Sequence, residues 1–490
     1  MVNENPVPQT KSFADGFRNR CKDIKTTRWV RFGIVALIYL LWVIWLDNYW
    51  FLLGLPLLFD IYITGYIPFT WWKKSKNAVV RQVMSWVDAI VYALILAYFL
   101  FCFVGQNYEI PSSSLEKTML IGDYVWVNKA VYGPRVPVTP IHFPLTHNTW
   151  PVVGGNSYAS WPENGYRRLP GLRNVERNDI VVFNFPAGDT VATRFEQAED
   201  PRHYEQRVEE YGWQRVNTDK ATFGDIIYRP VDRRTNFVKR AVGLPGERLK
   251  IVSDTIYING RPLKTPKNAQ FSHLIAADTP LDAEVLRKEG IAVADVQQAD
   301  GEFRQYLAAI NPVFGTAQYL YAMPLTTTAA ENLRRQSGVL WVGKALDFGL
   351  SSRATFPKQA SRTWSLSDYG GDNGILIPKK GMTVPMNAAT WDLYNRVIRN
   401  YERHTDSWLD GNTVYIDGKP AGTYTFAMDY YFMMGDNRDL SQDSRFWGFV
   451  PEDHIVGTPV LILASFDRER PWTDGKIRWN RILRRPNPDK

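Results

Sequence analysis

Residues 110–129 read Ile-Pro-Ser-Ser-Ser-Leu-Glu-Lys-Thr-Met-Leu-Ile-Gly-Asp-Tyr-Val-Trp-Val-Asn-Lys, a cluster of serines followed by an alternating apolar and polar segment. The alternation predicts a β-strand, and the Gly-Asp pair before it marks a turn. An apolar run, Trp86–Val104, ends six residues before this stretch begins. The serine cluster therefore stands between an apolar helix and a strand, close to the point where the chain would leave a membrane.

Three apolar runs precede the serine cluster, and they predict a membrane anchor at residues 32–104. Phe32–Leu46 is unbroken, Tyr49–Ile67 is interrupted by a proline and an aspartate, and Trp86–Val104 contains one aspartate. A hydrocarbon layer of about 30 Å needs roughly 20 apolar residues in a helix, so we expect the first run to extend at its ends. The anchor is expected to have about three transmembrane helices.

Basic residues beside the runs predict the orientation of the anchor. A leader, residues 1–31, holds Lys11, Arg18, Arg20, Lys22, Lys25, Arg28 and Arg31, and the loop after the second run holds Lys73, Lys74, Lys76 and Arg81. Lysine and arginine near span ends are retained on the cytoplasmic side. Three spans that start in the cytoplasm place everything after Val104 on the extracytoplasmic, or periplasmic, side. We therefore expect a multi-pass protein of the cytoplasmic (inner) membrane.

The composition excludes several classes of protein. The chain has 490 residues, of which 45% are hydrophobic, and this is incompatible with a disordered or low-complexity protein. The two cysteines, Cys21 and Cys102, cannot make a disulfide framework. The net charge of +8 is concentrated in the leader, the basic loop and residues 466–490, so a nucleic-acid groove is disfavoured. The basic tail either rests on anionic lipid or is a solvated last strand.

The extracytoplasmic part is predicted to be mostly β, with a large α+β insertion. Thr255-Ile-Tyr-Ile-Asn-Gly and Thr413-Val-Tyr-Ile-Asp-Gly echo each other, and each is typical of a strand that ends in a tight turn. We expect a catalytic domain at 105–267 and 413–490 and an inserted extracytoplasmic subdomain at 268–412. Helices are predicted near 280–289, 327–337 and 390–403, the last with an aromatic face that we interpret as core.

Common catalytic and cofactor signatures are missing from the sequence. It contains no Gly-x-Ser-x-Gly, no His-Glu-x-x-His, no phosphate-binding loop and no dinucleotide fingerprint, and its six histidines are dispersed. We expect no metal and no cofactor. A Ser-His-Asp triad stays open, since sequence distance alone does not exclude one.

Two further segments complete the chemical pattern. Phe237-Val-Lys-Arg-Ala-Val-Gly-Leu-Pro-Gly-Glu places Lys239 in an apolar strand, and Gly435-Asp-Asn-Arg-Asp-Leu-Ser-Gln-Asp-Ser-Arg is a polar loop. At these segments, at the serine cluster and at Arg177-Asn-Asp-Ile-Val-Val-Phe, the chain resembles the bacterial type I signal peptidases. These are membrane-anchored Ser-Lys proteases that remove signal peptides from exported preproteins.

The resemblance implies Ser114 as the nucleophile and Lys239 as the general base of an acyl-enzyme mechanism. The chemistry of the residues agrees, because a lysine can accept a proton at neutral pH only where burial destabilises its ammonium form. By resemblance, the oxyanion hole consists of the Ser114 backbone N–H and the Ser112 hydroxyl. The polar loop would supply Ser441, which orients the amine, and the ion pairs Asp443–Arg445 and Asp436–Arg240.

Substrate recognition also follows from the resemblance. The resembled enzymes bind the segment before the cut as an added β-strand, with small residues at the first and third positions in shallow pockets. Residues flanking the dyad that could form these pockets are Tyr108, Ile110, Pro111, Met119, Phe237 and Val238. The expected partners are signal-peptide-bearing preproteins, membrane lipid and the secretion machinery, with no nucleic acid.

One departure from the family pattern lies beside the nucleophile. The family has Ser-Met-x-Pro-Thr where this chain has Ser114-Leu-Glu-Lys-Thr, so we expect a charged, freer turn in place of one stiffened by proline. Other functions stay open at this point. They are a related Ser-Lys protease with a regulatory substrate, a catalytically inactive periplasmic scaffold and a module that binds cell-wall glycan.

Overall fold

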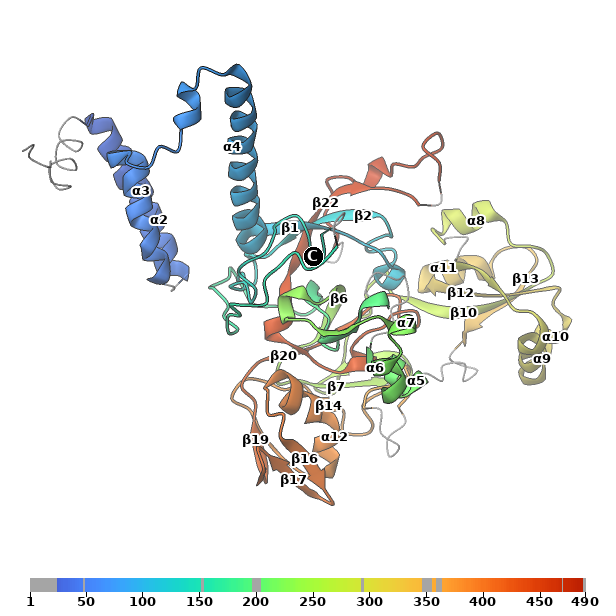
Figure 1. Cartoon of the computed structure of the whole chain (residues 1–490). Helices are drawn as coiled ribbons and strands as arrows, with labels where there is room; N and C mark the ends of the chain where they lie inside the picture. The colour runs from blue at the N-terminus through green and yellow to red at the C-terminus, as the bar shows by residue number, and fades with distance from the viewer. Residues whose placement is uncertain are drawn as a thin grey trace, which may run out of the picture. The chain divides into compact units, whose positions relative to one another are not determined.

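The computed structural model describes residues 24–46, 49–150, 154–195, 204–291, 295–345, 355–357, 364–468 and 470–487 (Figure 1). Most of the predicted leader, 1–31, lies outside these residues. The chain divides into two compact units, Met1–Phe99 and Leu100–Lys490, and each is described by itself.

The N-terminal unit is helical. Its elements are α2 (Thr26–Leu46), η1 (Tyr49–Leu53), α3 (Gly54–Phe59), η2 (Asp60–Thr64), η3 (Trp71–Lys74) and α4 (Ala78–Phe99). Within the described residues, two helices are long and apolar enough to cross a membrane, Thr26–Trp45 and Ala78–Val104. Most of their large apolar side chains are exposed, as is expected where lipid covers them.

The second predicted span, Tyr49–Ile67, forms a shorter apolar helix, Phe51–Thr64. Its end has a local cause. The Asp60 carboxylate accepts hydrogen bonds from the backbone N–H of Tyr66 (2.6 Å) and Ile67 (3.0 Å), and Gly65 takes a left-handed conformation with φ of 55°. These contacts turn the chain out of the helix before it reaches the length of a typical span.

The C-terminal unit continues from α4 through a helical turn, η4 (Leu100–Val104), into a seven-stranded antiparallel sheet. The strand order is β1-β2-β22-β3-β6-β20-β21. The bounds are β1 Gly105–Glu109, β2 Asp123–Asn128, β3 Ile180–Asn184, β6 Asn236–Gly243, β20 Tyr430–Met434, β21 Val450–Pro451 and β22 Ile455–Ser465. The register shifts twice along the β2–β22 pair and once between β22 and β3, and such bulges curl a sheet.

The curled sheet has a hydrophobic cluster on each face, because side chains alternate along its strands. On β3, Val181 and Phe183 point into a cluster with Ala241 of β6, whereas Ile180 and Val182 point into a cluster with the β2 side chains. The predicted mostly-β domain is present. Its three motif segments are the turn after β1, strand β6 and the loop after β20, and β6 and β20 are neighbours in the sheet.

A second core lies under smaller sheets. They are β14-β7-β8-β9 (Ile375–Leu376, Arg248–Val252, Thr255–Ile258, Arg261–Pro262), β15-β19 (Thr383–Pro385, Thr423–Thr425) and β16-β17-β18 (Ser407–Asp410, Thr413–Ile416, Lys419–Pro420). Helix α12 (Ala388–Arg396) and its continuation η10 (Val397–Tyr401) pack on this core. The predicted aromatic face of this helix is buried, as core, at Trp391, Tyr394, Val397, Ile398 and Tyr401.

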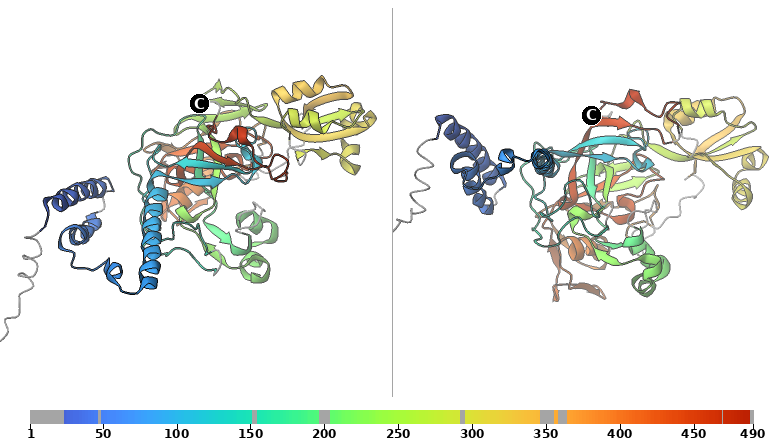
Figure 2. Two further views of the ribbon diagram at one scale, coloured as in Figure 1. Left: turned by 90° about the horizontal axis from the view of Figure 1, so that it is seen from above. Right: turned by 45° about the horizontal axis from the view of Figure 1, so that its top comes forward.

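Residues 270–344 build a separate α/β layer, here called the inserted subdomain. Its sheet order is β11-β12-β10-β13 (Gln297–Gln298, Tyr319–Thr326, Gln270–Ala277, Val339–Lys344). Helices α8 (Ala283–Lys288) and α11 (Thr327–Arg334) cover the face of Ile275, and α9 (Gly301–Ile310) and α10 (Pro312–Thr316) cover the face of Leu274. Figure 2 shows the strands and helices of this layer, coloured yellow, in two further views. The helices predicted near 280–289 and 327–337 are present, while α9 and α10 were not predicted.

The segment 268–412, which the sequence predicts to be one insertion, thus divides between two cores. Its second half pairs with strands outside the segment, since Ile375 lies opposite Leu249 and Ser407 lies opposite Ile416. A small layer of β4 (Thr190–Ala192) and β5 (Ile226–Tyr228) with helices α5 (Tyr204–Tyr211), α6 (Trp213–Thr218) and α7 (Lys220–Phe223) completes the unit.

Candidate active site

Ser114 lies in a tight turn that the β1–β2 pair encloses. Beyond the strands, Ile110 N donates to Asp123 O (2.9 Å) and Gly122 N donates to Ile110 O (3.0 Å), so residues 111–121 form a closed loop. Ser114 sits in the 3-10 turn η5 (Ser113–Leu115) and is 5% exposed. Ser112 precedes this turn in an extended conformation and is exposed, so the run of three serines changes from open to buried within one turn.

Lys239 reaches Ser114 from the middle of β6. It lies directly opposite Val181 in the sheet and therefore points to the same face as Phe237 and Ala241. Its Nζ donates a hydrogen bond of 2.6 Å to Ser114 Oγ, although the two residues are 125 positions apart. The structure brings the predicted nucleophile and the predicted base together.

The surroundings of Lys239 destabilise its ammonium form. The side chain is 3% exposed, and its Nζ lies 5.6 Å from the centre of the Phe237 ring. Burial lowers the pKa of Lys239 to about 8, although the carboxylates of Asp443 and Asp436 raise it in part. A neutral lysine amine is thus accessible near neutral pH, which general-base chemistry requires.

The polar loop after β20 takes part in both ion pairs that the resemblance implies, one within the loop and one with Arg240 of β6. Asp436 binds the Arg240 guanidinium with two hydrogen bonds of 2.7 Å, and Asp443 binds Arg445 at 2.8 and 2.9 Å. All four side chains are at most 2% exposed. Asp436 also accepts 2.7 Å from Thr118 Oγ1, so it ties β6 to the loop that carries Ser114.

The same polar loop holds the backbone of the serine turn. Asn437 N donates to Ser114 O (3.1 Å), and its side-chain amide donates to Ser113 O (3.3 Å). Gly435 permits this approach, because a Cβ there would lie 2.6 Å from Ser114 O. Sequence analysis did not single out Asn437 or Thr118, although Thr118 is the threonine of the Ser-x-x-x-Thr pattern.

Ser441 does not make the contact expected of it. Its hydroxyl lies beside Gly435 and donates to Gln442 O at 3.4 Å, whereas Lys239 Nζ bonds to Ser114. The physical reason is steric, because the close approach of the polar loop at Gly435 leaves Ser441 packed against the backbone. The described residues therefore contain no hydrogen bond between Ser441 and the lysine.

The six expected pocket residues lie in three places. Tyr108, Ile110, Met119 and Val238 pack in the cluster on one face of the sheet, and Phe237 packs in the cluster on the other. Adjacent strand residues point to opposite faces, so Phe237 and Val238 cannot line one pocket together. Pro111 is exposed.

Tyr108 has a further setting. It lines a cavity of about 100 Å³ with Lys129, Arg135 and other residues, and neither Ser114 nor Lys239 lines this cavity. Within the described ranges, no group of three or more His, Cys, Asp or Glu side chains is placed to hold a metal ion.

Comparisons with known proteins identify relatives of this chain. A family model described as signal peptidase, peptidase S26, matches residues 83–291 and 391–464. The chain is 55% identical over 411 residues to a signal peptidase I of Buchnera aphidicola subsp. Acyrthosiphon pisum (strain APS), which is 84% of this chain and 82% of the relative. It is 39% identical over 407 residues to a signal peptidase I of Haemophilus influenzae, which is 82% of this chain and 76% of the relative.

Proposed function

Because the chain belongs to the signal peptidase family, peptidase S26, we propose that Ser114 and Lys239 are the dyad with which this serine endopeptidase removes signal peptides. The observation that carries the proposal is the 2.6 Å hydrogen bond between Lys239 Nζ and Ser114 Oγ in a buried setting. A serine hydroxyl needs an adjacent base to become a nucleophile, and a desolvated lysine is one of the few side chains that can serve.

The proposed reaction has two halves. Neutral Lys239 accepts the Ser114 proton while Oγ attacks the scissile carbonyl carbon, and the resulting ammonium then protonates the leaving amine. Water, deprotonated by the same amine, hydrolyses the acyl-enzyme and restores the serine. The Ser114 backbone N–H and the Ser112 hydroxyl are the proposed donors to the oxyanion, which forms in both halves.

The neighbouring side chains have positioning roles in this proposal. Asp436 connects Arg240 of the lysine strand with Thr118 of the serine loop, so one carboxylate fixes the distance between base and nucleophile. Asp443 accepts from Gly435 N (3.1 Å) and holds Arg445, which keeps the polar loop folded against the dyad. Ser441 is proposed to support this loop at Gly435.

The substrates are preproteins that carry signal peptides, and the enzyme is a membrane protein. We propose further that small residues at the first and third positions before the cut are selected, and that lipid and the secretion machinery present them. The catalytic domain, 105–267 and 413–490, is proposed to face the extracytoplasmic side after a multi-pass anchor at 32–104.

The test is cleavage of a purified preprotein with an Ala-x-Ala site by the detergent-solubilised chain, with the cut located by mass spectrometry. The expected result is one cut after the second alanine, lost in Ser114→Ala and retained in Ser113→Ala, its neighbour in the same turn. Equal cutting by Ser114→Ala and the unchanged enzyme would remove Ser114 from the mechanism.

A further inference from the structure

The turn that follows the nucleophile has a backbone conformation that proline cannot take. Lys117, which stands where the resembled family has proline, has φ of 68°, whereas a proline ring locks φ near −65°. A left-handed conformation is unfavourable for a side chain other than glycine, so contacts elsewhere must hold it. The turn is therefore not a freer version of the family turn, as the sequence indicated, but a differently shaped one.

The Lys117 side chain supplies those contacts by reaching into the inserted subdomain. Its Nζ donates to Glu289 O at 2.5 Å and also to Gly290 O, at the C-terminal end of α8. The last carbonyls of a helix lack partners within it and attract a cation. Gly290 leaves room for the ammonium, because a Cβ at this position would lie 2.6 Å from Lys117 Nζ.

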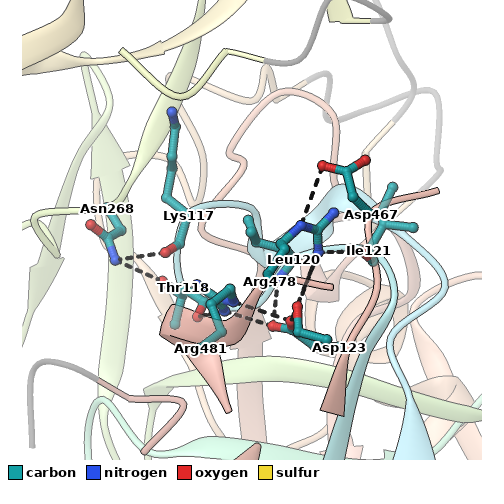
Figure 3. A network of polar contacts seen from close by, with 10 residues as sticks. Lys117, Thr118, Leu120, Ile121, Asp123, Asn268, Asp467, Arg478 and Arg481 are labelled. Carbon is teal, nitrogen blue, oxygen red and sulfur yellow. Dashed lines mark hydrogen bonds and ion pairs between the residues drawn. The ribbon is translucent and has the colours of Figure 1, made fainter. Parts of the chain in front are cut away.

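A second contact from the same region fixes the Lys117 backbone. Asn268 Nδ2 donates to Lys117 O at 3.2 Å and to Thr118 Oγ1 at 3.4 Å, as Figure 3 shows. In that view the Lys117 ammonium points away from Asp123, toward which Arg478 and Arg481 turn. The backbone of Lys117 is thus bound by Asn268, which leads into the inserted subdomain, and its side chain is bound by Glu289 and Gly290, which belong to that subdomain.

The other end of the loop is anchored independently. Arg481 donates to Thr118 O at 3.1 Å and to Asp123, and Arg478 donates to Ile121 O at 3.0 Å (Figure 3). Asp123 is fully buried. These contacts begin at Thr118. Before it, Leu115 is buried against Ile110 and Met119, and Lys117 adds the link from this stretch to the inserted subdomain.

We propose that Lys117 is a positioning residue that couples the inserted subdomain to the nucleophile turn. Its tertiary contact with the subdomain stands in place of the proline that would stiffen the turn locally. The inference rests on the proposed role of Ser114. In the described part of the chain Lys117 makes no hydrogen bond to Ser114 Oγ or Lys239, so we expect it to act on the rate of the chemical step through the placement of the serine and not on substrate binding.

The test compares Lys117→Met and Lys117→Arg with the unchanged enzyme in the preprotein assay. Lys117→Met is expected to lower kcat about tenfold, the order of one charge-assisted hydrogen bond, with KM unchanged. Lys117→Arg can still donate to both carbonyls and is expected to keep most of kcat. Lys220→Met is the matched control, because Lys220 is 75% exposed and pairs with Asp225 at the surface.

A second variant tests the same contact from its other side. Gly290→Ala leaves the nucleophile loop intact, and it is expected to lower kcat as Lys117→Met does. The double variant should be no worse than either single one, since both remove one interaction. If Lys117→Met fails to fold, Gly290→Ala alone decides.

Unchanged kcat in the folded single variants, or additive losses in the double variant, would overturn the coupling. Ser114→Ala in the same assay separates the two proposals. If that variant is inactive and Lys117→Met is normal, only the coupling fails; if Ser114→Ala is active, the dyad itself fails.

Discussion

Lys239 determines the pH dependence of the proposed reaction. Burial lowers its pKa to about 8, and only its neutral form can take a proton from Ser114. At pH values below about 8 most molecules carry the ammonium form, so kcat/KM is expected to rise about tenfold per pH unit there and to level off above it. A steady-state pH profile measures this. A profile that is flat between pH 6 and 9 would contradict the assignment of Lys239 as the base.

The same burial has a cost in stability. The unfolded chain has the ordinary lysine pKa of 10.5 and the folded chain about 8, so the unfolded state binds more protons between these values. Stability from this group therefore rises with pH from about 8 to 10.5, and at neutral pH the penalty is roughly 3 kcal/mol. Lys239→Met is expected to be inactive yet at least as stable at pH 7, as thermal unfolding would show. A large loss of stability would mean that the charge is well compensated.

Ser112 is the proposed side-chain donor to the oxyanion. It is exposed, and no side-chain hydrogen bond ties it to the turn, so its hydroxyl is free to meet a developing oxyanion. Ser112→Ala is expected to lower kcat about 100-fold with little change in KM, as the loss of one oxyanion donor does. Ser113→Ala, in the same run of serines, is the control. Equal effects of the two variants would remove the distinction between them.

At this scale the resemblance to the family indicated which residues to examine. It implied Ser114, Lys239 and the two ion pairs of the polar loop by motif, and the structure places Lys239 Nζ 2.6 Å from Ser114 Oγ. The pocket residues could not be assigned in the same way. Phe237 and Val238 are adjacent in sequence but point to opposite faces of β6, and only the sheet shows which face holds the lysine.

Strand β6 and the polar loop after β20 are joined by a buried ion pair. Arg240 and Asp436 are 1% and 0% exposed, and the pair also holds Thr118. Arg240→Met leaves a buried carboxylate without its cation, so a loss of about 3–5 kcal/mol in unfolding free energy is expected. Asp225→Asn, in the exposed pair with Lys220, should cost less than about 1 kcal/mol. Similar losses in the two variants, measured by chemical denaturation, would contradict this account.

Element pairing explains why the insertion was delimited differently in the sequence. The helices of 268–412 are visible as local periodicity, but β14 pairs with β7 across more than a hundred residues. β15 likewise finds β19 on the far side of α12. Strands of two or three residues are too short for their sequence pattern to show which strand they pair with. The echo of the Thr255 and Thr413 hairpins predicts an insertion between them, but it does not show that the second half of this segment pairs with strands outside it.

At the scale of the whole molecule, the membrane topology depends on the short helix Phe51–Thr64. At 1.5 Å per residue it covers roughly 20 Å, less than the about 30 Å of a hydrocarbon layer. The distribution of the basic residues favours the opposite conclusion, that this helix crosses the membrane. If this helix does not cross, the leader and the basic loop after it face opposite sides, and one of them violates the retention of Lys and Arg in the cytoplasm.

The free-energy cost of moving the basic residues across the membrane outweighs the cost of a short span. We therefore predict that the segment crosses and that both basic regions face the cytoplasm. Moving several lysines or arginines across a bilayer costs more than the local thinning that accommodates a short span. Cys21 and Cys102 are the only cysteines, so Cys102→Ser leaves a single thiol in the leader. In spheroplasts a membrane-impermeant maleimide should not label Cys21, and permeabilisation should expose it.

Two further variants, each with a single introduced cysteine and without the native thiols, test the positions of the basic loop and of the C-terminal unit. Ser75→Cys, in the basic loop, should be protected like Cys21, whereas Lys220→Cys, 75% exposed in the catalytic unit, should be labelled in intact spheroplasts. Labelled Cys21 with protected Ser75→Cys would mean that the short helix enters and leaves on one side while the catalytic unit stays outside. Protection of Lys220→Cys would contradict the extracytoplasmic placement itself, because an enzyme in the cytoplasm could not meet signal peptides after export.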